Sequence, residues 1–320
     1  MGHDRGVQLD LVWRRRLAAL AAVGALAAVA GAAAGAGGGG GNGAGAAAAG
    51  AGAAARAKPA QLPGGGRRLF PDRRVVAFYG NPRDDELGAL GIGTPTQAGR
   101  RLVRQARPYG RKSRPVLPAM ELISTVATAA PGPTGLYRDH VAFSTIRRYL
   151  NAARRVHALL ILDVQPGRGE FGPEIERLEP FLREPDVGLA LDAEWHVGAD
   201  QLPGKVIGST DADVVNSAAR FMARLVRERD LPEKLLLVHR FTNDMIARPQ
   251  RLAQFPGVRT VVNVDGFGSN TVKIAKYQSF VAGTPRMGRG FKVFYKEDVK
   301  TMTPHQVMAL TPRPDVVVYE

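Results

Sequence analysis

The clearest chemical motif in this chain is a pair of carboxylates two residues apart, in Asp192-Ala193-Glu194. If the segment is a strand, alternation places both carboxylates on one face together with the small residues Gly188 and Ala190. Two neighbouring carboxylates shift each other's pKa values, so that one stays protonated and acts as a general acid. The motif therefore predicts acid–base chemistry, although two solvated loop acids or an ion pair with an arginine would also explain it.

Other polar side chains end or follow short apolar runs elsewhere in the chain. Asp163 and Asp265 are further candidate catalytic carboxylates, and ion pairing or helix capping is the alternative for Asp163. A second group has side chains suited to substrate binding, by hydrogen bonds, by charge or by stacking on a sugar ring: Glu121, Gln165, Trp195, His239, Lys292 and Tyr79. The competing interpretations are core packing for the two aromatic residues, a structural hydrogen bond for His239, an arginine partner for Glu121 and a surface position for Lys292.

The spacing of the apolar runs indicates how these residues are brought together. Eight runs alternate with helix-like segments, which is typical of a (β/α)8 barrel, an α/β fold, whose active site lies at the carboxyl ends of its strands. The runs are Val75–Tyr79, Val116–Glu121, Ala158–Asp163, Val187–Asp192, Lys234–His239, Arg259–Asp265, Phe291–Glu297 and Asp315–Glu320. The sequence leaves no residues for a helix after the eighth strand, so another element must cover the outer face of that strand.

Local signals place several helix boundaries. Thr94 followed by Pro95 predicts a helix start, because threonine caps a helix and proline is tolerated at its first position. Asp211 is a cap for a long helix, and Thr303 precedes a short one. The seventh strand is predicted to contain both Lys292 and Tyr295.

The carboxylate motif resembles the Asp-x-Glu on the fourth strand of barrel glycosidases that cleave N-acetylated sugars, such as chitinases and one class of lysozymes. In those enzymes the glutamate is the general acid and the aspartate orients neighbouring groups. The resemblance therefore implies that Glu194 is the acid and Asp192 its partner. The longer chitinase pattern is absent, because Ala190 and Val187 occupy the positions of its two further aspartates.

The barrel region as a whole is similar to a group of poorly characterised secreted actinobacterial TIM-barrel proteins that resemble glycoside hydrolases. This similarity spans Val75 to Glu320. The segments that carry it are Glu121–Thr125, Leu162–Arg168, Leu189–Trp195, Asp265–Gly268 and Gly290–Lys292. The resemblance implies a fold and a location rather than a particular reaction.

Composition divides the chain into three parts. Residues 1–35 form a signal peptide or a signal anchor, since three arginines (14–16) precede an alanine-rich apolar run. Residues 36–66 are a Gly/Ala-rich linker to which we assign no structure, and residues 67–320 form the barrel domain. Charges before the apolar run place the barrel outside the cytoplasmic membrane, either secreted or anchored by its N-terminal segment.

Charge and residue usage limit the partners. The formal net charge is +15, which favours a polysaccharide or an anionic cell-wall polymer as partner. Nucleic-acid motifs are absent, and contact with a membrane is expected only through an uncleaved N-terminal segment. The chain has no cysteine, so no disulfide can form and the fold depends on its core alone. We also expect a monomer with no cofactor and no metal.

These observations predict a glycoside-hydrolase-like barrel that acts by carboxylate acid–base catalysis. A non-catalytic carbohydrate-binding or structural barrel is one alternative, and a mouth filled by its own side chains would favour it. A metal-dependent hydrolase is the other, with Asp163, Asp192, Glu194, His239 and Asp265 as possible ligands. A carboxyl separation of about 5 Å would suit a retaining mechanism, and roughly 6.5–9.5 Å an inverting one.

Overall fold

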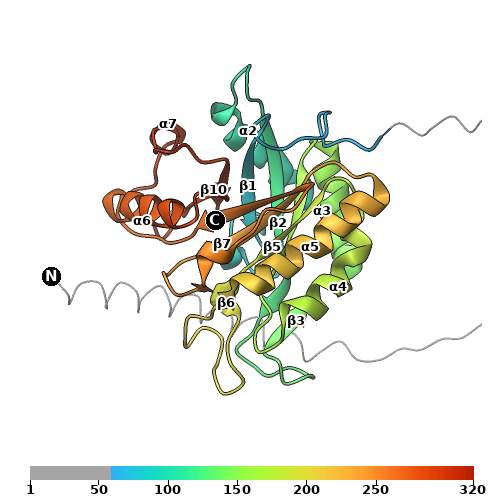
Figure 1. Ribbon diagram of the computed structural model, residues 1–320, viewed down its shortest axis with the longest axis vertical. Helices are drawn as coiled ribbons and strands as arrows, with labels where there is room; N and C mark the ends of the chain where they lie inside the picture. Colours follow the sequence, from blue (N-terminus) through green and yellow to red (C-terminus); the bar gives the residue numbers. More distant parts are fainter. Residues whose placement is uncertain (1–58) are drawn as a thin grey trace, which may run out of the picture.

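Parallel strand pairing closes into a barrel in the computed structural model, which describes residues 59–320. The strands pair in the order β1-β2-β4-β5-β7-β9-β10-β11, and β11 pairs with β1 to complete the ring (Figure 1). Their bounds are β1 (Arg74–Gly80), β2 (Val116–Ala127), β4 (Leu159–Val164), β5 (Val187–Leu191), β7 (Lys234–Arg240), β9 (Val258–Val264), β10 (Gly288–Val293) and β11 (Val316–Tyr319). The predicted (β/α)8 fold, as a single domain, is confirmed.

Helices connect most of these strands and cover the outside of the ring. They are α2 (Pro95–Ala106), α3 (Phe143–Arg155), α4 (Phe171–Leu182), α5 (Ala212–Arg229), α6 (Asn270–Gly283) and the short α7 (Pro304–Met308). In Figure 1, α3, α4 and α5 lie along one side of the barrel, and α6 and α7 lie along the opposite side. Between β7 and β9 the chain runs through strand β8 (Ile246–Ala247) and the 3-10 turn η4 (Pro249–Arg251) in place of an α-helix.

Three helices begin with the side-chain caps that the sequence predicts. The Thr94 side chain accepts a hydrogen bond from the backbone N–H of Gln97, and Asp211 caps α5 in the same way through Asp213. Thr303 and Gln306 form a reciprocal capping box at α7. Each cap provides a partner for a backbone N–H that would otherwise lack one at the helix end.

Alternation along the strands separates two layers of the barrel interior. Ile161, Leu237 and Val261 are fully buried aliphatic residues on β4, β7 and β9. The residue two positions further along each of these strands is polar and shares its face: Asp163, His239 and Asn263. The hydrophobic part of the interior therefore lies below a polar layer at the carboxyl ends of the strands.

The rim of the barrel departs from the predicted pattern at two strands. β10 ends at Val293, so Tyr295 and Glu297 belong to the loop that follows and not to the seventh strand. β2 continues to Ala127, beyond the predicted end at Glu121, because its extension pairs antiparallel with β3 (Arg138–His140). A separate two-stranded sheet is formed by β6 (Thr210–Asp211) and β8.

The outer face of β11 is covered without a helix following that strand. Tyr319 stacks on Tyr295, and its hydroxyl is hydrogen-bonded to that of Tyr109 in the 3-10 turn η2 (Arg107–Tyr109). Phe78 of the neighbouring strand β1 contacts the same ring edge-on. An aromatic cluster contributed by strand β1 and two connecting segments thus protects the strand from water.

The predicted export segment, residues 1–35, lies outside the described residues. No helix within residues 59–320 is long and apolar enough to cross a membrane. The described chain begins inside the predicted linker, and Leu62 there is buried against the hydrophobic core.

Close packing between β9 and β10 generates a stability prediction. A Cβ atom added at Gly290 would lie 2.4 Å from Oδ1 and 2.8 Å from Cα of Asn263, so neighbouring atoms must move. We expect Gly290→Ala to lower the free energy of unfolding by about 1–3 kcal/mol in a urea titration. Gly172→Ala in α4 is the control, because nothing lies within 4 Å of its added Cβ, and it should not destabilise the protein. Equal stability of the two variants would contradict this packing.

Candidate active site

The imidazole of His239 lies at the centre of a buried polar network at the carboxyl ends of the strands. Its Nε2 atom is 2.9 Å from Oε1 of Glu121 and 3.8 Å from Oδ1 of Asp163, and its Nδ1 atom is 3.1 Å from Oδ2 of Asp265. Asn263 approaches Nδ1 through its side-chain nitrogen at 3.3 Å. The side chains of His239, Glu121 and Asp163 are fully buried, so solvent does not screen these contacts.

Lys292 extends the network across β10 and β11. Its ammonium group is 3.0 Å from Oδ2 of Asp265 and 2.6 Å from Oε2 of Glu320. The same group lies 3.8 Å from the centre of the Tyr79 ring, which is a cation–π contact. Lys292 is therefore a buried counter-ion within the site and not a surface lysine.

The hydroxyl of Tyr79 links Asp163 to one further acid, Asp192. It lies 3.2 Å from Oδ2 of Asp192 and 3.4 Å from Oδ2 of Asp163, so both carboxyl groups approach one oxygen atom. Gln165 donates from Nε2 to the Tyr79 hydroxyl at 2.9 Å and to Asp192 at 3.3 Å. The backbone N–H of Ala127 fixes the orientation of Gln165 by donating to its Oε1 atom.

The environment of His239 favours its charged form. Burial alone would lower the pKa of His239, but the hydrogen bonds with Asp265 and Glu121 hold that pKa well above its ordinary value. The imidazole is therefore a cation near neutral pH. Its charge offsets part of the repulsion among the surrounding carboxylates.

The environment of Asp163 favours its neutral form. Burial raises the pKa of Asp163 well above its ordinary value, and the negative charge of Asp192 raises it further, whereas the charge of His239 acts in the opposite direction. Burial also raises the pKa of the Tyr79 hydroxyl, with the same two aspartates adding to the effect. The raised pKa favours a proton on Asp163, beside a second carboxyl group, which is the arrangement of a general acid.

Several oxygens of this network have capacity for another ligand. Oε2 of Glu121, Oδ1 of Asp163 and Oδ1 of Asp192 are buried and have no hydrogen-bond partner. Glu121, Asp163 and His239 each offer a ligand atom, and those atoms lie within 4.8 Å of one another. The same oxygens suit either the polar groups of a substrate or a divalent cation.

Asp192 and Glu194 do not lie on one strand, contrary to the predicted shared strand face. β5 ends at Leu191, and Ala193–Trp195 is a 3-10 turn, η3. The turn forms because the neighbouring loop supplies its partners: the N–H of Gly208 donates to the carbonyl of Glu194 at 2.7 Å. Asp192 contacts Tyr79 and Gln165. Burial lowers the pKa of Lys276 in α6, and the charges of Asp265 and Glu194 act in the opposite direction.

The predicted aromatic platforms are also enclosed. Trp195 is buried and packs against Ala127, and one face of the Tyr79 ring is covered by the Lys292 ammonium group. Whether either ring contacts a sugar stays a prediction. In the described structure the hydroxyl group of Tyr79 contacts Asp163 and Asp192, and its ring contacts the Lys292 ammonium group.

The network gathers most of the sequence-predicted site residues. Eight of them are linked by the contacts described above: Tyr79, Glu121, Asp163, Gln165, Asp192, His239, Asp265 and Lys292. Sequence reasoning assigned no site role to Asn263, Lys276 or Glu320. The polar ends of β9 and β11 were a signal for Asn263 and Glu320, but nothing in the sequence indicates Lys276.

The fold and this network define the chain as a TIM-like barrel with a cluster of ionisable groups at the catalytic end of its strands. No protein-family model matches the chain, and no curated protein is significantly similar to it. Among solved structures, a D-allulose 3-epimerase from Methylomonas sp. is similar at 10% sequence identity and a TM-score of 0.37. The match covers 79% of this chain and 86% of that one, and at this TM-score it carries no argument about activity.

The charge on His239 generates a prediction about pH and stability. A histidine whose folded pKa is raised stabilises the fold below about pH 6.5, and this contribution is lost as the pH rises through the folded pKa. We expect His239→Gln to lower the free energy of unfolding, with a deficit that shrinks as the pH increases above 6.5. Urea titrations at several pH values measure it, and His305→Gln, at an exposed position in α7, is the control. A deficit that grows with pH would contradict a cationic His239.

Proposed function

We propose that this protein is a carbohydrate-active hydrolase that uses carboxylate acid–base catalysis, with Asp163 as the proton donor. The observation that carries the proposal is the pairing of Asp163 and Asp192 around the Tyr79 hydroxyl, each with a buried oxygen that has no partner. A pair of neighbouring carboxyl groups meets the chemical requirement for hydrolysis of a glycosidic bond. The raised pKa of Asp163 supports its assignment as the acid.

The division of roles follows from the contacts. Asp163 donates its proton to the leaving oxygen as the bond to the anomeric carbon breaks. Asp192, held by Tyr79 and Gln165, keeps a fixed orientation and faces the positive charge that develops on the sugar ring. Water then supplies the hydroxyl group of the product, and its remaining proton returns to a carboxylate of the pair.

Glu194 is a less favourable acid than the sequence motif suggests. It lies in the 3-10 turn η3 and not on β5, and its charge acts on Lys276. The resemblance to chitinase-type barrels depended on a strand that carries both acids. Asp163 on β4 takes the role that the motif gave to Glu194.

Substrate access requires movement at the mouth. Asp163 and His239 are 0% exposed, and Asp192 is 2% exposed. Loops that open and close over an active site are common, and closure strengthens the electrostatic contacts inside. We propose that the loops following β5 and β7 move to admit a sugar chain, and that the barrel works outside the cytoplasm on a wall polysaccharide.

This same enclosure favours a second candidate, a non-catalytic barrel. A barrel whose mouth is filled by its own side chains would bind polymer elsewhere on its surface or would have a structural role. Against this, structural barrels fill their interior layers with branched aliphatic residues, whereas this layer contains at least five buried ionisable groups. Turnover of any glycan would exclude the non-catalytic candidate.

A third candidate, a metal-dependent hydrolase, is favoured by the convergence of Glu121, Asp163 and His239. Metal binding would require His239 to lose its shared proton, because a ligating imidazole nitrogen must be deprotonated. Calorimetric titration of the protein with Mn²⁺ or Zn²⁺ tests this candidate. Tight binding that is lost in His239→Gln would favour it over acid–base catalysis alone.

The central prediction concerns Asp163→Asn, which keeps the shape of the side chain and removes its transferable proton. We expect turnover to fall by about 10²–10⁴-fold. Peptidoglycan, arabinogalactan and chitin-type oligomers are the substrates for the initial screen, and thermal unfolding verifies that the variant is folded. Asp200→Asn, on an exposed loop, is the matched control and should retain full activity.

Two results would overturn the assignment of Asp163. Full activity of Asp163→Asn on a substrate with a poor leaving group would exclude it as the acid. If Glu194→Gln lost activity while Asp163→Asn kept it, Glu194 would be the proton donor, as the sequence motif predicts.

A further inference from the structure

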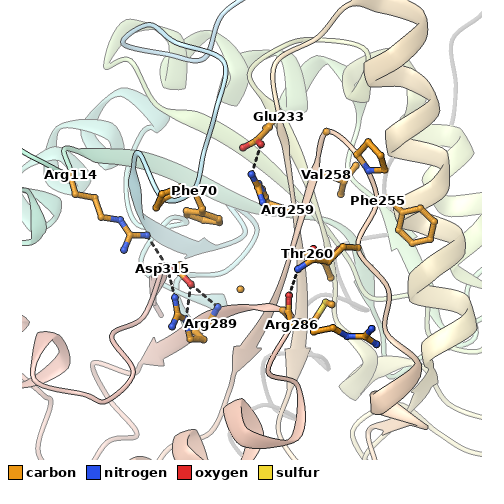
Figure 2. Close-up of a pocket in the computed structure, with 16 residues that line it drawn as sticks. Phe70, Arg114, Glu233, Phe255, Val258, Arg259, Thr260, Arg286, Arg289 and Asp315 are labelled. Carbon is orange, nitrogen blue, oxygen red and sulfur yellow. Dashed lines mark hydrogen bonds and ion pairs between the residues drawn. The ribbon is translucent and has the colours of Figure 1, made fainter.

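A cavity of about 600 Å³ lies at the opposite end of the barrel from the candidate active site. It is formed where β9 and β10 begin and where the chain enters β11 (Figure 2). In Figure 2, Phe70, Arg114 and Asp315 lie on one side of the hollow, and Phe255 and Arg286 lie on the other. This end of a TIM barrel normally contributes to stability rather than to function.

A second cavity of about 560 Å³ adjoins the first and shares Arg114 and Arg289 with it. The second cavity adds Arg74, Arg111 and Arg313 to its lining. Together, seven arginines line the two cavities, against only two carboxylates, Glu233 and Asp315. The arginines are far apart in the sequence and are brought together only by the fold.

The carboxylates neutralise only part of this charge. Glu233 pairs with Arg259 at 2.7 Å, and Asp315 is shared between Arg114 at 2.7 Å and Arg289 at 2.9 Å. Among the described residues, no carboxylate forms an ion pair with Arg111, Arg286 or Arg313. All three are exposed, so their guanidinium groups are accessible to a ligand.

The pKa of the buried Arg74 is also affected by the surplus of positive charge. Its Nε atom donates to the carbonyl of Pro314 at 3.0 Å. Burial lowers the pKa of Arg74 to about 10, and repulsion from Arg114 contributes to the shift. A bound anion would relieve this repulsion.

We propose that the two joined cavities bind a linear polyanion of phosphodiester units, such as a phosphate-containing envelope polymer. This inference goes beyond the proposed hydrolase activity, and it assigns the anionic partner to the face opposite the catalytic one. Each cavity has room for several units of such a chain, since pockets of about 300–1,000 Å³ hold ligands larger than one phosphate.

The geometry favours phosphate over carboxylate. Guanidinium groups reach the cavities from several segments, namely Arg111 and Arg114 before β2, Arg286 and Arg289 around the start of β10, and Arg313 before β11. A tetrahedral phosphate accepts hydrogen bonds from several directions, whereas a carboxylate presents two oxygens in one plane.

The aromatic lining argues against nucleic acid as the ligand. Binding of single-stranded nucleic acid uses exposed aromatic side chains as stacking platforms for successive bases. Phe70 is only 9% exposed, and Phe255 is a partly buried ring on the far side of the cavity. We therefore expect the cavities to recognise the charged phosphodiester backbone of a polymer and not nucleic-acid bases.

Fluorescence anisotropy with a labelled glycerol-phosphate oligomer tests the proposal on the full-length chain. The triple variant Arg111→Gln, Arg286→Gln, Arg313→Gln removes three charges that form no ion pair with a described carboxylate, so its fold should persist, which thermal unfolding checks. We expect its affinity to fall on the order of tenfold or more. Arg100, Arg148 and Arg224, exposed on α2, α3 and α5, are changed to Gln together as the control of equal net charge.

The outcomes separate the proposal from its rivals. Loss of affinity in the cavity triple, with affinity retained in the control triple, supports the site. Equal loss in both would show a general charge effect and overturn it, as would no binding to the wild type. An oligogalacturonate or a single-stranded DNA of equal charge that binds as tightly would overturn the selectivity for this phosphodiester polymer. Because no glycan turnover is measured, the result is independent of the proposed hydrolase activity.

Discussion

The buried contact between His239 and its carboxylate partners Glu121 and Asp265 is the interaction on which the rest of the mouth depends. The two carboxylates stabilise a positive charge that burial alone would not permit. That charge, together with Lys292, in turn makes it possible to hold several acids in a space closed to water. Removing one partner from a buried ion pair typically costs about 3–5 kcal/mol, because the other charge is left without compensation.

The two ends of the barrel carry charged side chains of opposite sign. Because all eight barrel strands run parallel, their carboxyl ends and their amino ends lie on opposite faces. The carboxyl ends carry the enclosed acids, and the amino ends carry the arginine-lined cavities. Between them lies an aliphatic layer that includes Ile161, Leu237 and Val261. This layer therefore separates the proposed polymer site from the proposed catalytic site.

Much of the fold and of the mouth follows from local pattern. The alternation of apolar runs with helix-like segments predicts the eight barrel strands correctly, because the sequence period distinguishes strands from helices. Glu194 departs from the strand pattern because it lies in a 3-10 turn, where the N–H of Gly208 in the loop that follows donates to its carbonyl. Lys276 and the arginine cavities were not predictable, since they depend on how separate segments pack and leave no periodic signal.

Neutron diffraction from crystals grown near neutral pH tests the account most directly, because it locates hydrogen atoms. The central claim is that His239 is a cation and that Asp163 holds a proton. We expect deuterium on both ring nitrogens of His239 and on one carboxyl oxygen of Asp163. A neutral imidazole together with a bare Asp163 carboxylate would contradict the account.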